Sequence, residues 1–383
     1  METLSIPQKA LHTPEVGDHT TIHWKQLWSL AALYGSVIIG WIAYQNYQPR
    51  LLVQFRFTDF TFLLTVAQGI ILVITPLIAG KLGDRFRFEK GHRLPVISSG
   101  ISFAAMIFMA VAFTLLGNPG EIFRWMLPVL IVFWLIAMSI FTSPALSTIE
   151  LFTPIDKLPH AMAVLTITGN LIYSLEPVIV DIIDYLGAPV TFILGGVVVF
   201  LSGYALKKNS LGLFRRSGNR EAGISSQGET IKSLYGSILF LGLTVGVATT
   251  MMFNAFPSVL EPKLNSLLPM QGKHMVVGIL LLSAILSWPT SFVVNKYGMN
   301  RIFQISFMLI AASACAIFFL DSTAGVLLMV MLFAIAFTSL SVSALPLAIH
   351  RAAHTEKVFC VGLFFSGVAL PEAFWEAWLV YGG

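Results

Sequence analysis

Three glutamates stand out because they lie in or beside long apolar stretches. Glu176 and Glu372 lie inside such stretches, and Glu150 lies at the end of another. Charged side chains within a membrane-spanning helix are costly and usually functional. Desolvation disfavours the charged form of a carboxyl group, so an acid in a poorly hydrated cavity can take up and release a proton. The three glutamates are therefore candidates for ion coupling.

Two of these glutamates also have a simpler interpretation. Glu176 could reach the outer interface beside Asp181 and Asp184, where water would solvate it. Glu150 could be a loop acid paired with Lys157. Both alternatives remain open from the sequence.

A polar stripe favours a functional position for Glu176. Thr166, Gly169, Tyr173 and Glu176 follow the helical repeat and share one face. A polar stripe on an otherwise apolar helix is expected to face a cavity rather than lipid.

Amide and aromatic side chains could hold a polar solute in the same cavity. Sugar sites use such groups for bidentate hydrogen bonds and for stacking on the sugar ring. The candidates for solute contact are Tyr44, Gln45, Asn170, Tyr173, Asn254 and Trp288. An aromatic belt at the outer membrane face explains Tyr44 and Tyr47 equally well.

The composition requires that membrane-spanning helices position these residues. Of 383 residues, 56% are apolar and 11% are charged, against roughly 25% charged in an ordinary soluble domain. This composition excludes a soluble enzyme. The net charge of +4 indicates basic loops at a membrane rather than nucleic-acid binding.

The sequence predicts no cofactor or metal. Phosphate-binding loops, HExxH, nucleophile elbows and CxxC pairs are absent from the sequence. Cys315 and Cys360 lie in apolar runs and are interpreted as small buried side chains. Scattered histidines at 12, 19 and 23 belong to a polar tail, where solvation is a better explanation than metal binding.

Eleven apolar stretches are long enough to cross a bilayer, which takes about 20 residues. They cover residues 26–48, 60–80, 94–117, 122–149, 160–184, 188–206, 233–257, 274–294, 302–320, 323–349 and 357–381. The predicted fold class is an all-α polytopic membrane protein in which the lipid bilayer is the solvent.

Lysines and arginines set the orientation of these spans. With the N-terminus in the cytoplasm, 18 of the 23 basic residues fall on the cytoplasmic side. The five on the outer side are Arg50, Arg56, Arg124, Lys263 and Lys273. The positive-inside rule therefore predicts a cytoplasmic N-terminus, and an odd number of spans predicts an outer C-terminus.

The spans divide into two halves. Residues 1–23 form a polar tail, 24–206 hold six spans, 207–232 form a basic linker rich in glycine and serine, and 233–383 hold five spans. Weak repeats at an offset near 200 residues relate the halves, such as Ser143–Leu146 with Ser343–Pro346. Duplicated halves around a central cavity are typical of secondary carriers.

The loop after the second span carries the clearest motif. It reads GKLGDRFRFEKGHRLP over residues 80–95. Glycines let helix ends approach closely, and an aspartate can accept hydrogen bonds from a helix N-terminus. Such a contact would be a latch that opens when the halves rock. We therefore expect a gating role for Gly80, Gly83, Asp84, Arg85, Gly91 and Arg93.

This loop resembles the cytoplasmic signature loop of the major facilitator superfamily. The spacing from Asp84 to Pro95 is similar to that of the sucrose/proton symporters and the glycoside–pentoside–hexuronide cation symporters. Two further patches resemble these sugar-carrying branches: Glu150 with the Gly169-Asn170 pair, and Gly362 with Pro371-Glu372.

The chain departs from this pattern in several places. Glu150 replaces an aspartate, and Glu372 replaces a glutamine. Asn295 stands where the second half should have an acid, so we expect a weaker second latch. The twelfth span of the superfamily has no counterpart among the predicted spans.

The resemblance implies two pseudo-symmetric helical bundles of six and five spans that work by alternating access. The expected activity is secondary transport of a small polar solute, a sugar or glycoside first, coupled to protons or another cation. The expected location is the cell's inner membrane. The alternative is a carrier-like accessory subunit of a membrane complex, with a protein partner on the face left by the missing span.

Overall fold

The computed structural model describes residues 21–57, 61–117, 125–224, 232–265 and 271–382. Within these residues, ten helices are long and apolar enough to cross a membrane, and one bent pair supplies an eleventh span. The predicted all-α polytopic fold is confirmed, and each predicted span overlaps one of these helices or the bent pair. The tail prediction for residues 1–20 and the linker prediction for 225–231 lie outside the described residues.

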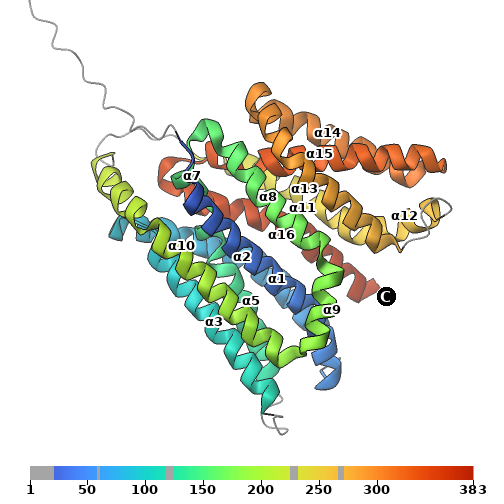
Figure 1. Ribbon diagram of the computed structural model, residues 1–383, viewed down its shortest axis with the longest axis horizontal. Coiled ribbons are helices and arrows are strands. Elements are labelled where there is room, and N and C mark those ends of the chain that lie inside the picture. The colour runs from blue at the N-terminus through green and yellow to red at the C-terminus, as the bar shows by residue number, and fades with distance from the viewer. Residues whose placement is uncertain (1–20, 58–60, 118–124, 225–231, 266–270, 383) are drawn as a thin grey trace, which may run out of the picture.

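The helices before the linker lie together on one side of the molecule (Figure 1). They are α1 (Trp24–Gln54), α2 (Thr61–Lys90), α3 (Leu94–Leu116), α5 (Met126–Ile140), α6 (Thr142–Leu146), α7 (Ile149–Phe152), α8 (Leu158–Ser174), α9 (Glu176–Leu186) and α10 (Ala188–Ile224). Helix α10 continues through residues 207–224, which the sequence assigned to the linker.

The later helices form the other side (Figure 1). They are α11 (Tyr235–Thr250), α12 (Phe256–Leu264), α13 (Gly272–Tyr297), α14 (Met299–Phe319), α15 (Thr323–His350) and α16 (Lys357–Gly382). Short 3-10 turns η2 (Ile155–Lys157) and η4 (His354–Glu356) precede α8 and α16. The two sides meet mainly where α2 packs on α16 and where α8 packs on α13.

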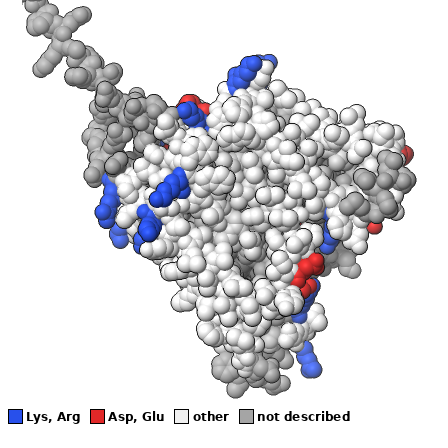
Figure 2. Space-filling model, viewed as in Figure 1, with Lys and Arg blue, Asp and Glu red and all other residues white. Residues whose placement is uncertain are grey.

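The outer surface suits a lipid environment. Large apolar side chains such as Ile285, Met308 and Phe374 are strongly exposed. Figure 2 shows a face that is almost free of charge across its middle, with Lys, Arg, Asp and Glu near its ends. In water this surface would be unfavourable, whereas hydrocarbon covers it at no cost.

Two of the interruptions within spans lie just before a proline. Helices α8 and α9 meet at an angle of 59°. Glu176 is the first residue of α9, and Pro177 is the second. A π-helical turn η3 (Met251–Ala255) joins α11 to α12 ahead of Pro257. A proline cannot donate a backbone hydrogen bond, so it fits the start of a helical segment. The continuous span predicted over 160–184 is thus a bent pair.

Candidate functional site

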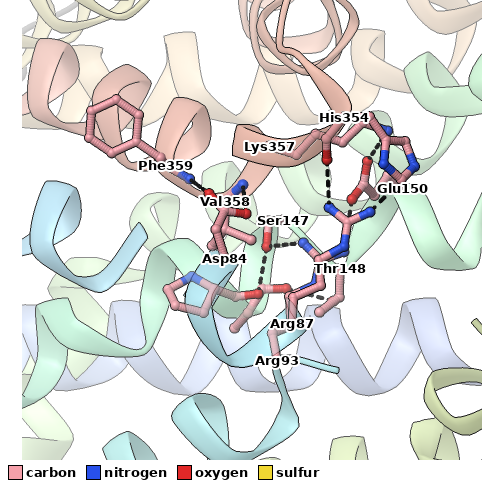
Figure 3. A network of polar contacts seen from close by, with 12 residues as sticks. Asp84, Arg87, Arg93, Ser147, Thr148, Glu150, His354, Lys357, Val358 and Phe359 are labelled. Atoms are coloured by element: carbon pink, nitrogen blue, oxygen red, sulfur yellow. Dashed lines mark hydrogen bonds and ion pairs between the residues drawn. The ribbon is translucent and has the colours of Figure 1, made fainter. Parts of the chain in front are cut away.

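Asp84 joins the end of α2 to the beginning of α16. Its two carboxylate oxygens accept hydrogen bonds from the backbone N–H groups of Val358 (3.1 Å) and Phe359 (2.8 Å). These amides belong to the first turn of α16, where unpaired N–H groups and the helix dipole favour a negative charge. Figure 3 shows Asp84 pointing at this helix end. The carboxylate therefore fastens the two sides of the molecule together.

Glu150 makes a second connection beside Asp84. It forms ion pairs with Arg93 (2.8 Å) and with Lys357 of α16 (2.6 Å), and its side chain is only 9% exposed. Arg93 also donates to the Ser147 hydroxyl at 2.7 Å. The short helix α7 positions the glutamate, and the turn before α3 positions the arginine. The alternative prediction, a loop acid paired with Lys157, does not fit this carboxylate, because it is buried and its ion pairs are with Arg93 and Lys357.

Arg87 adds a third connection on the same face of α2. Its guanidinium donates to the backbone carbonyl oxygen of His354 at 3.0 Å and contacts the His354 ring at 3.4 Å. We call this set the first latch: Asp84, Arg87, Arg93, Ser147, Glu150, His354, Lys357, Val358 and Phe359 (Figure 3). Four of these residues are not among the gating or ion-coupling residues predicted from the sequence: Arg87, Ser147, His354 and Lys357.

Glycines allow the backbones of α2 and α16 to approach. A Cβ atom at Gly80 would lie 2.6 Å from the Cα atom of Phe359, and one at Gly83 would lie 2.7 Å from a Val358 methyl carbon. Gly91 begins the turn after α2 with φ of +74°, a conformation that favours glycine. Three of the expected gating residues thus have steric reasons for their type.

Arg85 is the exception among the expected gating residues. Its side chain is 73% exposed and pairs with Glu89 one turn along α2, at 2.6 Å. It points away from α16, so the guanidinium groups of the first latch are those of Arg87 and Arg93.

A neutral contact joins α8 to α13. His160 Nδ1 lies 2.6 Å from the Ser291 hydroxyl, and His160 Nε2 lies 3.1 Å from the side-chain amide of Asn295. Trp288 packs on the same imidazole ring. We call His160, Ser291 and Asn295 the second latch. Asn295 is the residue at which the sequence predicts a weakened contact.

Farther along α2 and α16, a chain of polar groups runs between the two sides. The Tyr44 hydroxyl donates to Gln68 Oε1 at 2.9 Å, and Gln68 Nε2 donates to Glu376 at 3.1 Å. Tyr44 also stacks on Trp134, with ring centroids 4.5 Å apart. Gln68 and Glu376 are not among the residues predicted from the sequence to bind the solute or the coupling ion.

Glu372 continues this chain one helical turn before Glu376. Glu372 of α16 lies within electrostatic range of the Tyr173 hydroxyl, and Glu176 follows Tyr173 three residues along the bent span. Lys273 acts on Glu176 from the start of α13. In the described part of the chain, neither Glu176 nor Glu372 has a hydrogen bond or an ion pair. We call Tyr173, Glu176, Glu372 and Glu376 the acidic centre.

The remaining sequence candidates are spread over the molecule. Asn170 donates to Ser283 of α13 at 2.8 Å, and Asn254 lies in the π-helical turn η3, half-buried. Gln45 is exposed. Trp288 of α13 packs on His160 of α8. His160 precedes Tyr173 by 13 residues on α8, which places the two residues about 20 Å apart along the helix. The structure therefore brings Asn170 and Tyr173 onto one helix near the acids, but not Trp288.

Comparisons with known proteins agree with this architecture. The family model of the Major Facilitator Superfamily matches residues 30–374. A search of curated proteins finds no match. Among solved structures, the chain is similar to the proton:xylose symporter XylE bound to 6-bromo-6-deoxy-D-glucose. The TM-score is 0.59 at 13% identity, over 94% of this chain and 89% of that one, a likeness that shows the fold.

The family match covers nearly the whole chain and includes both latches and, of the acidic centre, Tyr173, Glu176 and Glu372. The protein therefore belongs to the major facilitator superfamily and is a secondary transporter rather than an enzyme.

Proposed function

We propose that the protein carries a sugar or glycoside across the membrane in symport with protons. The observation that carries this proposal is the acidic centre: in the described part of the chain its carboxyl groups form no ion pair, and they lie between the two sides beside a bent span. A low-dielectric interior disfavours an unpaired carboxylate. Binding a proton from one side removes this cost, and access of water from the other side solvates the carboxylate that forms when the proton is released.

In this proposal Glu372 and Glu176 carry the coupling proton. Both lie within electrostatic range of Tyr173, and the bend at Leu175 is where rocking of one side against the other would change their separation. Broken helices at the middle of a span are typical sites for substrates and coupling ions in transporters. The solute would contact Asn170 and Tyr173 beside them. The likeness to a sugar/proton symporter supports a sugar as the first solute to test.

Glu150 has a different role in this proposal. A carboxylate held by two cations is already stabilised in its charged form, so it has little reason to exchange a proton. We assign Glu150 to the gate together with Asp84. The positive-inside rule places this gate on the cytoplasmic side, which implies a state in which the cytoplasmic path is closed.

The test is uptake of labelled monosaccharides, disaccharides and glycosides into proteoliposomes with an imposed pH gradient. We expect gradient-driven uptake of at least one sugar, and Glu372→Gln should abolish accumulation while retaining exchange of the same sugar. Glu89→Gln is the matched control, because that acid is half-exposed on α2 and pairs with Arg85 one turn away. Full accumulation by Glu372→Gln would refute the assigned coupling role. If no sugar were taken up, with or without the pH gradient, the result would favour an accessory subunit.

A further inference from the structure

A cleft opens beside Glu376, away from the bend of α8 and α9. It lies between the C-terminal part of α1, the beginning of α2 and the end of α16, and has a volume of about 310 Å³. Ligand sites in proteins usually measure about 300–1,000 Å³. The space is therefore sufficient for a small organic molecule and too large for a closely coordinated metal ion.

The wall of the cleft combines one acid with neutral groups. Its polar members are Gln48, Thr61, Thr65, Gln68 and Glu376, and its apolar members include Leu52, Val53 and Leu379. The lining contains no lysine, arginine or histidine among the residues that the structure describes. Glu372 lies one turn away on α16 and does not line the cleft. The electrostatic potential in the cleft therefore favours a cation.

Gln68 holds the carboxylate in position. It donates to Glu376 Oε2, while its own carbonyl oxygen accepts from the buried Tyr44 hydroxyl. Tyr44 is in turn fixed by stacking on Trp134. This chain of contacts orients one carboxylate oxygen toward the protein and leaves Oε1 without a hydrogen bond in the described structure. Such an oriented acceptor matches the N–H groups of an ammonium ion.

We propose that this cleft is a binding site for a small organic cation. Its ammonium group binds Glu376, and its carbon skeleton packs on Leu52, Val53 and Leu379. This inference goes beyond the proposed transport of a sugar and does not require it, because the cleft is lined by a different set of residues from the proposed coupling pair.

Equilibrium binding to the full-length protein in detergent tests the proposal, with benzylammonium as the probe. Benzyl alcohol and benzoate have the same ring with a neutral and a negative head group, respectively. We expect a saturable calorimetric signal and a rise in Tm with benzylammonium only, since a ligand of the folded state stabilises it by mass action. Equal binding of benzyl alcohol would overturn the proposal, because an apolar additive would then explain the site.

Two variants separate charge from space. Glu376→Gln keeps the volume and removes the charge, and Thr65→Phe keeps the charge and fills the cleft. Each should weaken benzylammonium binding at least about tenfold, as loss of a desolvated charge contact or of the site's volume does. Glu176→Gln is the matched control, because it removes another membrane-embedded acid that does not line the cleft. Unchanged affinity in Thr65→Phe would contradict the assigned location, even if Glu376→Gln proved unstable.

The experiment uses no gradient, so its result is independent of the proposed symport. Loss of binding in Glu176→Gln as well as in Glu376→Gln would place the cation between these two acids and refute a site confined to the cleft. Failure of every sugar in the uptake assay would leave the benzylammonium result unaffected.

Discussion

The two latches join equivalent helix ends, yet they use different chemistry. Asp84 of α2 corresponds to Asn295 of α13, and the same alignment pairs Gly80 with Ser291. On the facing helices, Phe359 is the third residue of α16 and His160 is the third residue of α8. The first latch is ionic and buried, whereas the second is neutral and partly exposed.

A proline accounts for part of this difference. Val358, the second residue of α16, donates its N–H to Asp84. Pro159 is the second residue of α8 and has no N–H to donate. An aspartate at position 295 would therefore meet one donor fewer than Asp84 does. Asn295 instead contacts the His160 ring. Relative to the first latch, the second therefore lacks both the carboxylate of Asp84 and the N–H donor of Val358.

The two latches also differ in how closely the helix backbones approach each other. Gly80 lets the Phe359 backbone approach α2 directly. Ser291, its counterpart, has a side chain that contacts His160. The first latch is thus a close contact between backbones, and the second is a contact between side chains. We infer that opening the first latch costs more free energy, so it determines when this end of the transporter opens.

Glu150→Gln should have the largest effect on this comparison. It leaves the buried Arg93 and the partly buried Lys357 without their shared partner, and breaking a buried pair in this way costs about 3–5 kcal/mol. Cys360, fully buried just after Phe359, is a native reporter of opening. In a Cys315→Ala background, alkylation of Cys360 by N-ethylmaleimide should accelerate by about a hundredfold or more.

The control for this measurement is Glu89→Gln, which removes an exposed acid from the same end of α2. The double variant Glu150→Gln with Lys357→Gln should recover part of the slow labelling, because one of the two unpaired cations is removed. Slow labelling in the single variant would mean that the ion pairs do not hold this end closed.

Asp84→Asn should have the next largest effect. The amide can still accept one hydrogen bond, but it loses the negative charge at the N-terminus of α16, and charged hydrogen bonds contribute about 1.5–3 kcal/mol. Cys360 labelling should accelerate roughly tenfold to a hundredfold. The substituted side chain would then resemble Asn295 of the second latch. If Cys360 were labelled as slowly in this variant as in the parent protein, the charge of Asp84 would not explain the difference between the two latches.

Gly80→Ala should also open the first latch, for a steric reason. The added methyl group would lie 2.6 Å from the Phe359 Cα atom, and overpacking of this kind costs about 1–3 kcal/mol. Ser291→Ala is the matched change on the second latch, where it removes one hydroxyl contact to His160. We expect faster Cys360 labelling in Gly80→Ala and none of this acceleration in Ser291→Ala; equal effects would mean that backbone spacing does not distinguish the latches.

The spans were predictable because each needs only a local run of apolar residues, which the sequence shows directly. The partners of the first latch were not. Lys357 lies 207 positions after Glu150, and nothing local to either residue indicates the other. Tertiary packing of α2 on α16 brings them together. The same reason hid Gln68 and Glu376, whose hydrogen bond joins residues 308 positions apart.

Arg85 shows how helix length changes an interpretation. The sequence ended the second span at residue 80 and treated 80–95 as a loop, whereas α2 continues to Lys90. On a helix, Asp84 and Arg87 are three residues apart and share a face, while Arg85 points about 100° away. Arg87 therefore enters the latch and Arg85 does not. The bend at Glu176 was missed similarly, although Pro177 was a signal for it.

The smallest expected effect comes from rebuilding the second latch as an ionic one. Asn295→Asp alone places a carboxylate on an exposed residue facing Pro159, and exposed charge pairs contribute only about 0–1 kcal/mol. Adding Pro159→Ala restores the missing N–H donor. Ala161, fully buried, occupies the position in α8 that Cys360 occupies in α16, so Ala161→Cys is the equivalent reporter when Cys315 and Cys360 are replaced by alanine.

We expect Asn295→Asp to change labelling at residue 161 by less than about fivefold, and the double variant to slow it further than either single change does. Pro159→Ala alone is the control, because it supplies the donor without the acid. If Asn295→Asp alone slowed labelling as much as the double variant, charge would be sufficient and the proline would be irrelevant. The difference between the latches would then rest on a single side chain rather than on a matched pair of changes across the contact.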